Sequence, residues 1–180
     1  MSNKGFSLHD ALFIGFCATL LVALKGMLRL KLGITGHSMF LICFFYLICY
    51  GAVGKAGAIS ACGMLAGLLA MMLSVGKGGP FILLKFALPA IAMDFCLLIL
   101  PTLLGLKWRF IMLALVATLA WASKGLIEDL LVGMSIAVAL VQFAKSALFG
   151  SLFAVFAATL VPPVLQRLRS HDLLDNTELK

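Results

Sequence analysis

Charged residues are scarce in this chain, which excludes most classes of soluble protein. Only 12% of its 180 residues are charged and 63% are hydrophobic, whereas soluble globular domains carry roughly 25% charged residues. The apolar runs extend from about Leu8 to Val161. Because a soluble core of this size cannot bury so much apolar surface, we predict an all-α, polytopic integral membrane protein. We expect one transmembrane helical domain over residues 1–165 and a short cytoplasmic tail over 166–180.

Catalytic and metal-binding signatures are also lacking. The sequence has no HExxH, GxSxG or paired-carboxylate pattern, and GKGGP at 76–80 does not match the phosphate-binding GxxxxGK[ST] loop. The net charge of +7 comes without a basic stripe and interleaved aromatic residues, so it does not indicate nucleic-acid binding. We therefore predict no enzyme activity, no cofactor, no metal site and no nucleic-acid partner. Five cysteines lie inside apolar runs without CxxC spacing and are expected to be small packing residues, namely Cys17, Cys43, Cys49, Cys62 and Cys96.

Six apolar runs are predicted to span the membrane, since every backbone polar group must be satisfied within the protein in a bilayer. The first run, Leu8 to Leu24, follows one lysine and precedes no cleavage site, so we expect it to be retained. The last run is expected to end at Pro162 and Pro163. The other predicted spans are Ser38 to Val53, Ala56 to Val75, Phe81 to Leu104, Trp108 to Ser123 and, as the last, Ala144 to Val161.

The stretch from Leu126 to Val161 leaves the number of spans open, because it is too long for one ordinary span. We favour six spans, with Leu126 to Phe143 either an extramembrane or re-entrant elbow or an extension of the last helix. Seven spans are the alternative. With the N-terminus inside, six spans place more Lys and Arg residues inside than outside, which is a mild positive-inside bias. Both ends of the chain are then cytoplasmic.

The fourth predicted span contains the residues that are most costly to place in a membrane. A charge near the bilayer centre costs about 3 kcal/mol or more on insertion scales, so Asp94 and Lys85 should not face lipid. They lie on opposite faces of one helix and cannot pair while that helix is straight. Lys145 is the predicted partner of Asp94, whereas Lys85 is expected to extend toward the nearer membrane interface.

Small residues form stripes on two of the predicted helices. Ala11, Gly15, Thr19 and Ala23 recur every four residues in the first span, which gives one continuous face where another backbone can approach closely. This face either docks a partner or packs inside the chain. In the third span, Gly63 and Gly67 and a second stripe favour tight internal packing; the second stripe is Ala58, Cys62, Ala66 and Ala70.

The stretch from Leu32 to Asp94 resembles the core of the substrate-binding S components of energy-coupling factor (ECF) transporters. A glycine-histidine segment, GITGHS, opens the second span, and the glycine-rich turn GKGGP follows the third. The end of the chain, Ala147 to Ser170, resembles the last helix and basic exit of such subunits. The cobalt- and nickel-uptake branch is the most similar one, but MSNKGFSLHD lacks the methionine-histidine segment with which that branch binds its ion. The resemblance therefore does not imply cobalt or nickel as the substrate of this chain.

The resemblance implies a substrate-capture subunit of an ABC-type importer in the bacterial cytoplasmic membrane. Such a subunit binds a micronutrient, a vitamin-like small molecule or a metal, and docks on a transmembrane coupling subunit driven by ATPase subunits. The first helix of the family carries an AxxxA-type docking motif, which the stripe Ala11, Gly15, Thr19 and Ala23 matches. We expect the pocket at the outer ends of spans two to six, with His37, Lys77, Asp94 and Lys145 binding substrate. The alternative is a structural or assembly subunit of a larger membrane complex.

Overall fold

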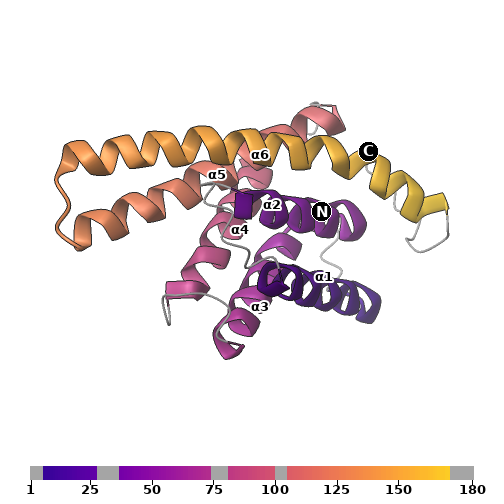
Figure 1. The fold of residues 1–180 in the computed structure, drawn as a ribbon. Helices are drawn as coiled ribbons and strands as arrows, with labels where there is room; N and C mark the ends of the chain where they lie inside the picture. The colour runs from indigo at the N-terminus through magenta and orange to yellow at the C-terminus, as the bar shows by residue number, and fades with distance from the viewer. Residues whose placement is uncertain (1–5, 28–36, 74–80, 100–104, 171–180) are drawn as a thin grey trace.

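Six helices make up the described part of the computed structural model, which covers residues 6–27, 37–73, 81–99 and 105–170. No strand occurs in these ranges, so the predicted all-α fold is confirmed. The helices, shown in Figure 1, are α1 (Leu8–Met27), α2 (His37–Val53), α3 (Ala58–Met72), α4 (Phe81–Ile99), α5 (Leu106–Leu131) and α6 (Ile136–Ser170).

Four of these helices, α1, α4, α5 and α6, are long and apolar enough to cross a membrane. The helices α2 and α3 are also apolar but shorter. Large apolar side chains remain exposed on the outside of the bundle, among them Phe16, Phe95 and Leu152, and in a bilayer these would face lipid chains. Length, composition and surface together indicate a polytopic membrane protein.

The helix α2 lies at the centre of the bundle and contacts α1, α3, α5 and α6. Its side chains are almost all buried or half-buried, including Tyr46 and Met39. The helix α3 packs along α4, and α5 packs along α6. Figure 1 shows that the distal half of α5 and the first half of α6 form a hairpin (orange) that extends beyond the other helices.

The beginning of α1 is held by a capping arrangement. The backbone N–H of Ser7 donates to Asp10 Oδ2 at 2.9 Å, and the N–H of Asp10 donates to Ser7 Oγ at 3.1 Å. These reciprocal bonds satisfy two backbone donors that the first helical turn leaves unpaired. Asp10 also pairs with Lys55, between α2 and α3, at 2.6 Å. The start of α1 and the α2–α3 turn therefore lie at the same end of the bundle.

The glycines of α3 are packed inside the bundle, as the sequence predicts. A Cβ atom at Gly63 would come within 2.4 Å of the Ala90 side chain on α4, and one at Gly67 would come within 3.2 Å of the Leu83 backbone. The second stripe is buried along its whole length. Small residues here bring the backbones of α3 and α4 close together, and close approach is what helix association in lipid requires.

Of the two alternatives for Leu126 to Phe143, extension of the last helix holds for the part from Ile136 onward, which begins α6, whereas the part up to Leu131 continues α5. The chain reverses in a short turn at Gly133, which has φ = 86°. The N–H of Met134 donates to the Asp129 carbonyl, and the N–H of Gly133 donates to the Leu130 carbonyl. This bonding pattern is a Schellman motif, in which glycine adopts the left-handed conformation that ends a helix. The described residues therefore form six helices, and this stretch does not contain a seventh.

The last helix is predicted to end at Pro162 and Pro163, but it continues through them to Ser170. A proline inside a helix removes one hydrogen bond and crowds the carbonyl four residues earlier. Packing of α6 on α2 continues past this point: Val161 and Leu165 are buried, and Leu165 lies against Gly51 on α2. Apolar contacts on both sides of the prolines therefore maintain a helix that proline alone would interrupt.

Candidate functional site

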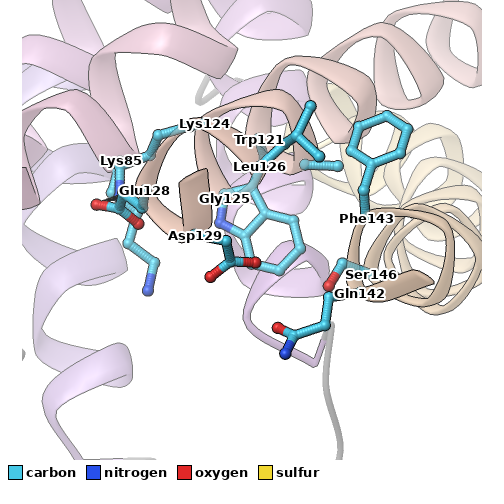
Figure 2. A pocket seen from close by; sticks show the side chains of 11 residues that line it. Lys85, Trp121, Lys124, Gly125, Leu126, Glu128, Asp129, Gln142, Phe143 and Ser146 are labelled. Carbon is cyan, nitrogen blue, oxygen red and sulfur yellow. Dashed lines mark hydrogen bonds and ion pairs between the residues drawn. The ribbon is translucent and has the colours of Figure 1, made fainter. Parts of the chain in front are cut away.

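A pocket lies where the start of α4 meets the α5–α6 hairpin, and most of its polar lining residues come from α5 and α6. The pocket has a volume of about 80 Å³ and is open to the outside. Lys85 of α4 lines it on one side (Figure 2). Five of its lining residues bear charge or an amide: Lys85, Lys124, Glu128, Asp129 and Gln142. Such a concentration of polar groups contrasts with the apolar composition of the chain.

Helical spacing explains how these residues reach one pocket. Trp121, Gly125 and Glu128 recur at intervals of three or four residues on α5, so they share one helix face. Gln142 and Ser146 are related in the same way on α6. The two faces meet because α5 and α6 pack along each other, so the hairpin supplies most of the pocket.

One end of the pocket is basic. Lys124 forms an ion pair with Glu128, one helical turn further along α5. Lys85 lies close enough to Lys124 and Glu128 for their charges to act on it. Lys25, near the end of α1, does not line the pocket; its Nζ lies over the ring of Phe86, the residue that follows Lys85. Two lysines and two carboxylates therefore line the pocket, and their formal charges sum to zero.

Lys25 is unusual because its ammonium group is buried without a hydrogen-bond partner in the described residues. Its Nζ lies over the ring of Phe86, 4.1 Å from the ring centroid. A cation over an aromatic face is attracted by the ring's electrons, by about 0.5–2 kcal/mol. That contact compensates only part of the cost of removing the charge from water.

The other end of the pocket offers hydrogen-bonding groups around an aromatic ring. Figure 2 shows the carboxylate of Asp129 beside the Trp121 indole, with Gln142 and Ser146 on the far side. Trp121 provides a flat apolar wall, while the Asp129 and Gln142 oxygens can accept hydrogen bonds. The lining of the pocket therefore combines charged side chains, a flat aromatic surface and neutral hydrogen-bonding groups.

The predicted substrate-binding residues are not gathered in this pocket. His37 begins α2, but its side chain lies outside the described residues, as do Lys77, the segment 33–36 and the GKGGP turn. Lys145 is exposed on α6 next to the pocket residue Ser146 and does not line the pocket. The substrate roles of His37, Lys77 and Lys145 stay predictions. Of the three segments predicted to form the pocket, only the stretch after Lys124 lies within the described residues, and its role in substrate binding stays a prediction.

Asp94 is buried, as expected because a charge facing lipid is costly. It does not form the predicted ion pair with Lys145. Its Oδ2 accepts a hydrogen bond from the backbone N–H of Ser60 at 2.7 Å. Ser60 lies in the first turn of α3, whose N-cap residue, Gly57, has no side chain to cap it. Asp94 thus caps a neighbouring helix, and the positive end of that helix dipole favours its charge. Its predicted role in substrate binding stays a prediction.

The small-residue stripe of α1 faces away from the bundle. Ala11, Thr19 and Ala23 are exposed, and a Cβ atom at Gly15 would have no neighbour within 4 Å. The opposite face of α1 is buried, including Ile14, Ala18 and Leu21. The stripe on α1 therefore differs from the glycines of α3, because no described part of the chain covers it.

The sequence does not predict most of the pocket. Among its lining residues, Lys85 alone is singled out from the sequence, as a side chain that extends toward the membrane interface. Two signals could have identified the pocket: the helical spacing of Trp121, Lys124 and Glu128, and the Gly133 helix-ending signal that makes α5 and α6 a hairpin. The proximity of Lys25 and Lys85 depends on the packing of α1 against the rest of the bundle, which no local pattern specifies.

Comparison with known proteins identifies the fold. No protein-family model matches the sequence, and the comparison with curated proteins finds no match. A solved structure described as a crystal structure of an S-component of ECF transporter superposes with a TM-score of 0.68, covering 97% of this chain and 91% of that chain. The two sequences are 15% identical, so the likeness concerns the fold. The chain is an all-α, multi-pass membrane protein with the fold of an ECF transporter S-component.

Proposed function

We propose that this chain is the substrate-capture subunit of an ECF-type importer in a bacterial cytoplasmic membrane. On this proposal it binds a micronutrient and docks on a transmembrane coupling subunit that ATPase subunits drive. The likeness to a solved S-component supports the proposal along nearly the whole chain. Cobalt and nickel are not proposed as substrates, because in the described residues no group of three or more His, Cys, Asp or Glu side chains could hold a metal ion.

The observation that carries the capture function is the polar pocket between α4, α5 and α6. Charged side chains at membrane depth are costly and typically mark substrate or ion sites. The pocket combines charged side chains with an aromatic wall, and small-molecule sites commonly place a few polar groups beside apolar and aromatic surface. A subunit that only filled space in a complex would gain nothing from placing two lysines and two carboxylates around one pocket.

The proposed docking surface is the exposed stripe on α1. Association of helices in lipid depends on close backbone approach and van der Waals fit. Ala11, Gly15, Thr19 and Ala23 leave the α1 backbone accessible from outside the bundle. A helix of the coupling subunit would fit against this face.

Native mass spectrometry of the chain purified without partners tests the capture function. We expect the parent protein to carry one small molecule and to release it on denaturation. Ser146→Trp should abolish this binding, because the indole would fill the pocket that Ser146 lines. Ser123→Trp is the matched control, since Ser123 is exposed on α5 outside the pocket. Equal occupancy in all three proteins would show that the binding site lies elsewhere. If none of them carries a bound molecule, the capture function is contradicted.

A structural or assembly subunit remains the second candidate, and the α1 stripe is the observation that favours it. The same face would suit permanent packing in a larger complex. In that case the chain purified alone should aggregate or unfold, whereas a capture subunit should be stable and monomeric. Size-exclusion chromatography with light scattering separates these outcomes.

A further inference from the structure

An open apolar groove with a volume of about 400 Å³ lies between α5 and α6, apart from the polar pocket. Its α6 wall consists largely of small residues at intervals of three and four, which share one helix face: Ala144, Ala147 and Ser151. Its α5 wall is formed by Leu115, Thr118 and Leu119. Small side chains on one helix opposite larger ones on the other leave this hollow open along the surface of the helix pair.

The hydroxyl groups in the groove already have hydrogen-bond partners. The Thr118 hydroxyl donates to the Ala114 carbonyl at 2.8 Å, and the Ser151 hydroxyl donates to the Leu148 carbonyl at 2.9 Å. Both bonds stay within one helix, so an occupant of the groove need not supply a hydrogen-bonding group. Leu119 and Leu148, which also line the groove, remain exposed. The groove therefore suits a hydrocarbon chain.

Lys145 lies beside the groove at the depth of a membrane interface. It follows Ala144 in sequence, and its exposed side chain forms no ion pair in the described residues. One residue turns about 100° around a helix, so Lys145 flanks the groove, within reach of its long side chain. Lys145 and Arg167 are about 33 Å apart along α6, at about 1.5 Å per residue.

That separation matches a hydrocarbon core about 30 Å thick. With Arg167 at one membrane interface, Lys145 therefore reaches the other one. The groove residues of α6 begin beside Lys145 and continue toward the middle of the membrane. A positive charge thus stands at the level of the lipid headgroups, and an apolar hollow extends from it into the same leaflet.

The groove lies on other helices than the proposed docking stripe. It lies between α5 and α6, whereas α1 packs mainly on α2 and α3. A coupling subunit bound to the exposed face of α1 would therefore leave the groove in contact with lipid.

We propose that this groove binds one acyl chain of an anionic phospholipid, whose headgroup phosphate contacts Lys145. The inference goes beyond the proposed capture function, because the lipid is not the captured substrate and Lys145 does not line the polar pocket. The acyl chain packs against the apolar lining, and the ammonium group forms a charge-assisted hydrogen bond with the phosphate. An anionic headgroup is favoured over a zwitterionic one, which carries its own positive charge.

Native mass spectrometry of the delipidated full chain tests the proposal. The protein is mixed with equal amounts of phosphatidylglycerol and phosphatidylcholine that carry the same acyl chains. We expect one phosphatidylglycerol to be retained in preference to phosphatidylcholine by about fivefold, the factor that corresponds to about 1 kcal/mol for one lysine near a membrane surface. Retention of neither lipid, or of both equally, would overturn the proposal.

Two positions connect the retained lipid to the groove and to the lysine. Ala147→Phe should abolish retention, because the ring would fill the groove. Thr159→Phe, exposed on the same helix outside the groove, is the matched control and should retain lipid as the parent does. Lys145→Gln should still bind lipid but lose the preference for phosphatidylglycerol, whereas Lys145→Arg should keep it. Because Lys145 is exposed, these two variants test the proposal even if Ala147→Phe does not fold.

Three results would contradict the proposal. Undiminished retention in folded Ala147→Phe would show that the groove is not the site, and an unchanged preference in Lys145→Gln would show that the lysine does not select the headgroup. A lipid-free dimer that Ala147→Phe disrupts would assign the groove to a second copy of the chain. The capture function is measured separately, through the small molecule that Ser146→Trp should displace.

Discussion

Asp94 caps a helix other than its own. It lies on α4, yet it supplies the cap that Gly57 cannot provide to α3. The sequence indicates that this carboxylate must be buried and partnered, because lipid would not tolerate it. It does not indicate the partner, because the contact depends on how α3 and α4 pack and joins residues 34 positions apart.

We predict that Asp94→Leu destabilises the protein by about 1–2 kcal/mol, because it leaves the Ser60 N–H without its acceptor and removes the helix cap. Asp94→Asn is the matched control: its amide oxygen can still accept the bond, so the loss should be smaller. Unfolding of both variants by detergent titration, followed by circular dichroism, measures the difference. A leucine variant as stable as the parent would show that the cap contributes nothing.

At the scale of elements, the sequence predicts the existence of each helix but not always its end. Apolar runs identify α1, α2 and α3 to within about three residues at each end, because burial in lipid requires continuous helical hydrogen bonding. The α5–α6 region is different. Apolar composition continues through the turn, so only Gly133 signals the reversal, and apolar packing keeps α6 helical through Pro162 and Pro163.

Continuity of α6 can be measured with spin labels at Leu152 and Arg167, which are exposed on either side of the prolines. A continuous helix separates these positions by about 22 Å along its axis, at about 1.5 Å per residue. Electron paramagnetic resonance should give a single, narrow distance distribution near that value. The label sites are introduced as cysteines in a Cys96→Ala background, because the other four cysteines are buried. A broad distribution would show that the helix ends at the prolines.

At the scale of the whole molecule, polar contacts divide between two ends of the bundle. Asp10 pairs with Lys55, and Arg109 donates a hydrogen bond to Tyr50, at the end that the charge distribution predicts to be cytoplasmic. Lys25 and Lys85 lie toward the other end, where the pocket opens between α4, α5 and α6. This arrangement suits a subunit that takes up its ligand from outside.

Orientation in the membrane is testable with single cysteines at the two ends. A membrane-impermeant maleimide should label Ser135→Cys, at the turn between α5 and α6, in intact cells. It should label Ser170→Cys, at the end of α6, only after permeabilisation. The Cys96→Ala parent controls for background labelling. Labelling of Ser170→Cys in intact cells would place the C-terminal end of α6 outside and overturn the predicted topology.

The proposed docking role of α1 distinguishes an importer subunit from a self-contained membrane protein. Gly15→Leu adds a bulky side chain to a face with no neighbour within the described chain, so the Tm of the chain purified alone should not change. Copurification with a coupling subunit should be lost, because one large residue prevents close approach along the stripe. Ala137→Leu is the matched control, since Ala137 is a small, exposed residue on α6.

The most direct test is therefore to measure Tm and copurification with the coupling module on the same Gly15→Leu sample, beside the parent and Ala137→Leu. The account predicts an unchanged Tm and loss of copurification in Gly15→Leu only. A Gly15→Leu protein that is stable and still copurifies with the coupling module would contradict it.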